Sequence, residues 1–160
     1  MKSRLVSLCL FSVAFAYVEA AVVVYLRSSL PAYPPSGVTV LLNLGFISFV
    51  QFSAPVLLSA RTTVTEMFRE FATMVMLVTV GLLAGKNIKS KIGAFLIAFS
   101  LWDIFYYVFL KILIGWPKTL LDPDIFFLLP VPWIGPVLTA LLASTLLFLL
   151  GLVLFLQNPG

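Results

Sequence analysis

Residues 5–26 read LVSLCLFSVAFAYVEAAVVVYL, a stretch that Arg4 and Arg27 bound and that one charged residue, Glu19, interrupts. A helix needs about 20 mostly apolar residues to cross the roughly 30 Å of hydrocarbon in a bilayer. The stretch is therefore predicted to span a membrane as a helix. The basic residues before it also fit a signal peptide, but the apolar run is long enough that we expect an uncleaved anchor.

The rest of the chain has the same apolar character. Of its 160 residues, 62% are hydrophobic and 10% are charged, whereas soluble domains average about 45–50% apolar and about 25% charged residues. Ten basic and six acidic side chains are too few to cover the core of a soluble globule. We expect a multi-pass protein of a cell membrane, the bacterial plasma membrane, with the lipid bilayer as its first partner.

Composition also excludes several chemistries. The chain has no histidine and a single cysteine, Cys9, so His-ligated haem, His-containing zinc sites and dithiol redox pairs are excluded. No nucleophile elbow, P-loop or dinucleotide fingerprint is present. We expect no enzyme, no cofactor and no metal site. The basic residues are spread along the chain, which favours membrane topology signals over nucleic-acid binding.

The spacing of charges predicts one transmembrane domain over residues 1–160, an all-α bundle of about five helices at 5–26, 38–59, 65–85, 92–114 and 136–156. The second span follows a cluster of prolines and contains no charge. The third is too short unless its first turns carry charged residues into the membrane. Five spans put the lysine-rich loop at 86–91 outside, against the positive-inside rule, so four spans plus a re-entrant segment is the alternative.

A proline-rich segment precedes the last span. Asp122 and Pro123 can start a short helix that Pro130 would stop, and two further prolines predict extended or tightly turned backbone. Lipid offers no hydrogen bonds to such backbone. We expect an interfacial or re-entrant half-helix over residues 122–135.

Charged residues inside spans are the candidate functional residues, because a charge at the bilayer centre costs at least about 2.5–3.5 kcal/mol. Glu19 lies in the first span. It is either a ligand for a proton or solute, or the partner of a basic residue on a neighbouring helix. Glu66, Arg69 and Glu70 lie on one stripe of the third, where spacing lets Glu66 pair with Arg69. Glu70 is then left to a partner on another helix or to a cation. The alternative is a helix start whose acidic groups suit the helix dipole.

The fourth span carries a similar stripe. Asp103, Tyr107 and Lys111 follow one another at intervals of four residues and therefore share a face. Asp103 has apolar and aromatic neighbours, with no nearby partner except a hydroxyl group. Lys111 can pair with a carboxylate or extend to the interface. Asn43 and Gln51 in the second span read as amides that join helices or bind a solute.

Two functions fit these stripes. The first is a small channel or transporter for a proton, cation or small solute, with Glu19, Glu66, Arg69, Glu70, Asp103, Tyr107 and Lys111 as the ion- or solute-binding residues. The second is a noncatalytic subunit that stabilises a larger membrane complex through its charged stripes. Both readings predict a homo-oligomer or other membrane subunits as partners. They differ in whether the stripes face one shared interior cavity.

Overall fold

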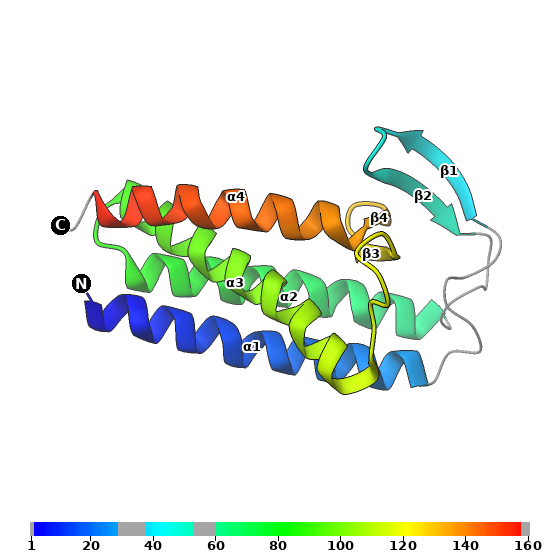
Figure 1. The fold of residues 1–160 in the computed structure, drawn as a ribbon, viewed down its shortest axis with the longest axis horizontal. Helices are drawn as coiled ribbons and strands as arrows, with labels where there is room; N and C mark the ends of the chain where they lie inside the picture. The colour runs from blue at the N-terminus through cyan, green and yellow to red at the C-terminus, as the bar shows by residue number, and fades with distance from the viewer. Residues whose placement is uncertain (1, 29–37, 53–59, 158–160) are drawn as a thin grey trace.

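The computed structural model describes residues 2–28, 38–52 and 60–157. Four long helices run up and down in an antiparallel bundle: α1 (Lys2–Ser28), α2 (Ala60–Ala84), α3 (Ile88–Ile114) and α4 (Val137–Leu156) (Figure 1). All four are long and apolar enough to cross a membrane. The start of α1, the end of α4 and the turn between α2 and α3 lie at one end of the bundle, as Figure 1 shows. The chain is thus a multi-pass membrane protein with four candidate spans.

Four of the five predicted spans match helices, including the early start of α2 that places Glu66, Arg69 and Glu70 in its first turns. The second predicted span, 38–59, is wrong over residues 38–52, and so is the prediction of an all-α fold. Instead of a helix, residues 38–52 hold two strands, β1 (Val38–Asn43) and β2 (Ser48–Phe52), which pair as an antiparallel hairpin. A charge-free stretch of this length can be one long helix or two short strands, and the turn at Gly45 selects the hairpin. The remainder of the predicted span, residues 53–59, lies outside the described residues.

The proline-rich segment is extended rather than a half-helix. It forms β3 (Pro123–Phe127) and β4 (Trp133–Pro136), which complete one antiparallel sheet in the order β1-β2-β4-β3. Pro123 and Pro136 pair at the ends of their strands, where a missing N–H group costs no ladder hydrogen bond. The expected extended or turned backbone is confirmed, and the expected helix at 122–135 is wrong. The sheet lies at the end of the bundle opposite the chain termini (Figure 1).

Helix α3 is the centre of the bundle, because α1, α2 and α4 all pack on it. Asn87 caps its start by accepting a hydrogen bond from the Ser90 amide at 2.9 Å, and Gly115 ends it in the left-handed region. Two glycines let α3 and α4 approach closely. A Cβ atom on Gly93 would lie 2.8 Å from the Gly151 carbonyl oxygen, and one on Gly151 would lie 2.9 Å from the Gly93 carbonyl oxygen.

The packed core fills the half of the bundle away from the sheet. It is a cluster of small and apolar side chains from all four helices: Leu8, Ala16, Leu77, Ala94, Ile97, Ala98, Trp102 and Phe155. Many other large apolar side chains, such as Leu83 and Leu146, are exposed on the outer helix faces. An exposed apolar surface of this extent suits contact with lipid.

Candidate functional site

A pocket of about 140 Å³ lies between α1, α2, α3 and β3. The polar side chains that line it are Glu19, Arg27, Glu66, Arg69, Glu70, Thr73, Asp103, Tyr106, Tyr107 and Asp124. They come from the last third of α1, the first half of α2, the second half of α3 and the strand after it. Because the helices alternate in direction, these parts all lie in the half of the bundle that is nearer the sheet (Figure 1).

Acidic residues are concentrated in this pocket. The chain has six Asp and Glu residues, and five line the pocket: Glu19, Glu66, Glu70, Asp103 and Asp124. The sixth, Asp122, lies in the turn before β3. With two arginines in the lining, the formal charge is two positive against five negative, or −3. Because charged side chains are costly in a membrane-spanning bundle, we expect these carboxylates either to form ion pairs or to serve the function of the protein.

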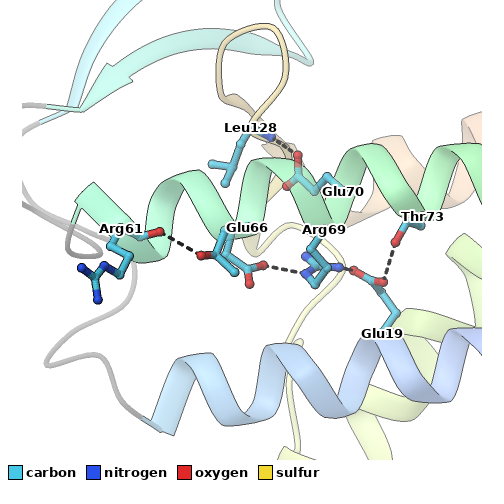
Figure 2. A network of polar contacts seen from close by, with 8 residues as sticks. Glu19, Arg61, Glu66, Arg69, Glu70, Thr73 and Leu128 are labelled. Atoms are coloured by element: carbon cyan, nitrogen blue, oxygen red, sulfur yellow. Dashed lines mark hydrogen bonds and ion pairs between the residues drawn. The ribbon is translucent and has the colours of Figure 1, made fainter.

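Arg69 pairs with two of these carboxylates and joins α2 to α1 (Figure 2). Its Nη1 atom forms an ion pair with Glu19, and its Nε atom donates to Glu66 Oε2 at 2.7 Å. Thr73 donates its hydroxyl to Glu19 at 3.4 Å. The predicted pairing of Glu66 with Arg69 is confirmed, and Glu19 has the basic partner on a neighbouring helix that its structural alternative required.

A second network holds β3 against α1 and α3. The Arg27 guanidinium lies 3.1 Å from Asp124 Oδ1 and 3.8 Å from the centre of the Trp116 ring. Tyr107 donates its hydroxyl to Asp124 Oδ2 at 3.0 Å. Sequence reasoning missed Arg27 and Asp124 as site residues, since it assigned Arg27 to membrane topology. The available signal was that Asp124 is an acidic residue within an otherwise apolar segment.

Glu70 and Asp103 differ from the other three carboxylates. Among the described residues, neither has a basic side chain within ion-pair distance. Glu70 accepts a hydrogen bond from the Leu128 amide at 2.8 Å, shown in Figure 2. Its partner is therefore on the segment after β3 and not on another helix, while the alternative of a bound cation stays a prediction. Asp103 accepts a hydrogen bond from the Ser144 hydroxyl at 2.7 Å, so its partner is on α4 and not among its neighbours in the sequence. In the described part of the chain, the ion pairs involve the other three carboxylates and not these two.

Lys111 does not line the pocket, so the structure does not bring it together with the other candidate residues. Its ammonium group donates to the Pro117 carbonyl at 2.7 Å and contacts the Gly115 carbonyl at 3.4 Å. The long lysine side chain reaches the polar end of α3, as the interfacial alternative expected. Asn43 and Gln51 are also apart from the pocket, since the sheet carries them. Asn43 accepts from the Gly45 amide at 2.7 Å within the β1–β2 turn.

Apolar and aromatic side chains make up most of the remaining wall. They are Val23, Leu26, Trp102, Ile125, Phe126, Phe127 and Leu128. Trp102 also belongs to the apolar core cluster, so it marks the boundary between the pocket and the packed half of the bundle. It is 6% exposed, and its Nε1–H group has no hydrogen-bond partner among the described residues.

The carboxylates are not arranged as a metal centre. Within residues 2–28, 38–52 and 60–157, no three His, Cys, Asp or Glu side chains are grouped so as to hold a metal ion. Comparison with known proteins adds no assignment, because the chain matches no protein family, no curated protein and no solved structure.

Proposed function

We propose that the protein is a small membrane transporter that binds a proton or a small cationic solute in the charged pocket. The observation that carries the proposal is the gathering of five of the six acidic residues around one pocket in the membrane-spanning bundle. Three separate helices and a strand contribute them. A chain this poor in charge has no structural need to bury so many carboxylates together, because apolar residues would pack there at lower cost.

The carboxylates divide into two roles in this proposal. Glu19, Glu66 and Asp124 are paired with arginines and shape the pocket. Glu70 and Asp103 bind the solute, because hydrogen bonds from one amide and one hydroxyl leave them able to accept further donors. The assignment moves the binding role away from Glu19, for which the sequence left open a role as a proton or solute ligand.

The arrangement favours a carrier over a channel. The pocket occupies the half of the bundle near the sheet, and the apolar cluster around Ile97 and Phe155 fills the other half. A solute in the pocket therefore meets packed side chains before it reaches the far side. Transport then requires the packed half to open, which predicts saturable carrier kinetics.

The test uses proteoliposomes that enclose a pH-sensitive dye, with a pH gradient imposed across the membrane. We expect proton entry well above that of empty vesicles, and a loss of at least tenfold in Glu70→Gln and Asp103→Asn. Asp122→Asn is the matched control, since it neutralises the acidic residue outside the pocket and keeps an acceptor oxygen. Entry equal to that of empty vesicles, under gradients of either direction, contradicts proton transport.

The second candidate function is a noncatalytic subunit of a larger membrane complex. It is favoured by the ion pairs of Arg69 and Arg27, which join separate elements and give part of the charge a structural role. Extraction in mild detergent followed by native mass measurement separates the two. A stable assembly with larger, cofactor-bearing proteins supports the subunit, whereas a monomer or homo-oligomer supports the transporter.

A further inference from the structure

We infer that the ligand of the pocket is an organic ammonium ion, a molecule that carries an –NH₃⁺ group next to an apolar group about the size of a benzene ring. The inference rests on the proposed function, because it names the class of solute that the same pocket binds. It is argued from three properties of the pocket: its charge, the arrangement of its carboxylates and the chemistry of its walls.

The charge of the lining selects a cation. Both arginines are engaged with Glu19, Glu66 and Asp124, and an anion would meet a surplus of carboxylates. An ammonium group carries three N–H donors, and Glu70 and Asp103 offer carboxylate oxygens that no basic side chain neutralises among the described residues. Such charge-assisted hydrogen bonds are roughly twice as strong as neutral ones.

The arrangement of the carboxylates disfavours a bare metal ion. Calcium takes 6–8 oxygen ligands and magnesium needs near-octahedral geometry. In the described part of the chain, no three acidic side chains gather closely enough for either. An ammonium ion has no such requirement, because two acceptors at separate points of the wall suffice.

The walls select an ion with an apolar part. Trp102, Tyr106, Phe126 and Phe127 supply aromatic surface beside the carboxylates, and aromatic faces attract cations that are within about 6 Å. The volume of about 140 Å³ is close to that of an engineered cavity of roughly 150 Å³ that binds benzene.

The test compares benzylammonium with benzyl alcohol, its uncharged counterpart, on the full chain in phosphatidylglycerol nanodiscs. We expect saturable binding of benzylammonium by calorimetry, at least tenfold tighter than that of benzyl alcohol. Glu70→Gln and Asp103→Asn should each weaken benzylammonium binding at least tenfold, whereas Asp122→Asn should leave it unchanged. If the parent protein binds benzylammonium and benzyl alcohol equally tightly, the inference is overturned. It is also overturned if the parent protein binds Ca²⁺ or Mg²⁺ more tightly than benzylammonium.

The ammonium group can come from a free amine or from a lipid headgroup. Adding phosphatidylethanolamine to the nanodiscs distinguishes the sources, since only a headgroup ligand would compete with benzylammonium. Failure of this inference is separate from failure of the transport function. Proton entry into vesicles without benzylammonium binding overturns the ligand class alone, whereas benzylammonium binding without flux of protons or of the amine overturns transport alone.

Discussion

Removing the Arg69 guanidinium tests whether the charges of the pocket hold the bundle together. In Arg69→Met, the Glu19 and Glu66 carboxylates lose their shared cation while they stay buried, with side chains only 10% and 8% exposed. Breaking a buried ion pair by removing one partner costs about 3–5 kcal/mol. We expect the free energy of unfolding to fall by about that amount, a decrease in Tm of roughly 6–20 °C for a chain of this size.

The assay is unfolding by SDS in mixed micelles, followed by tryptophan fluorescence. The control is the triple variant Glu19→Leu/Glu66→Leu/Arg69→Met, in which the whole charged cluster becomes apolar. Replacing a complete buried ion pair by apolar residues is often neutral or stabilising, so the triple variant should regain most of the lost stability. The reasoning is refuted if Arg69→Met unfolds within about 1 kcal/mol of the parent, or if the triple variant is as unstable as the single one.

Three further predictions concern packing, topology and pH. Gly151→Leu should destabilise the protein by at least about 1–3 kcal/mol, because its side chain would strike the Gly93 backbone; stability equal to the parent in the same SDS titration would contradict this close approach. In intact cells an impermeant thiol reagent should label Lys118→Cys but not Lys89→Cys, because we expect the turn between α2 and α3 to lie on the cytoplasmic side; disruption of the cells should expose Lys89→Cys to the reagent. The pKa of the Asp122 carboxyl is lowered by hydrogen bonds from the Thr119 hydroxyl and the Lys118 amide. The stabilisation of this turn is therefore present at neutral pH and is lost as the pH falls through that lowered pKa. The measurement is hydrogen exchange of the Lys118 amide, corrected for the intrinsic pH dependence of exchange. We expect this amide to exchange faster in acid.

The spanning helices could be predicted from sequence because their signals are local. Residues 5–26 and 136–156 are apolar over the length that a bilayer requires. The short third stretch had to start early to reach across, and α2 does so. Hydropathy failed at residues 38–52, because an apolar run does not distinguish one helix from a hairpin. The β-branched and aromatic residues Val38, Thr39, Val40, Phe49 and Val50, together with Asn43 and Gly45 at the turn, were the available strand signal.

The candidate site could be predicted in part. The cost of placing a charged side chain in a bilayer identified Glu19, Glu70 and Asp103 as candidate functional residues. In the structure all three line one pocket. Lys111 shares a face of α3 with Asp103 but does not line the pocket, since a long side chain near a helix end can reach backbone carbonyls instead. Spacing along one helix shows which residues share a face, but it does not show what that face meets.

The sequence by itself determined that this is a multi-pass membrane protein, and it located the four long apolar helices that could cross the bilayer. Those properties depend on composition and on periodicity within one helix. Only the tertiary structure decided which charges meet, because Arg69 and Glu19 are separated by 50 residues and Arg27 and Asp124 by 97. Pairing at such separations depends on how helices pack and on where the sheet brings β3, and that pairing distinguishes the carboxylates that shape the pocket from Glu70 and Asp103.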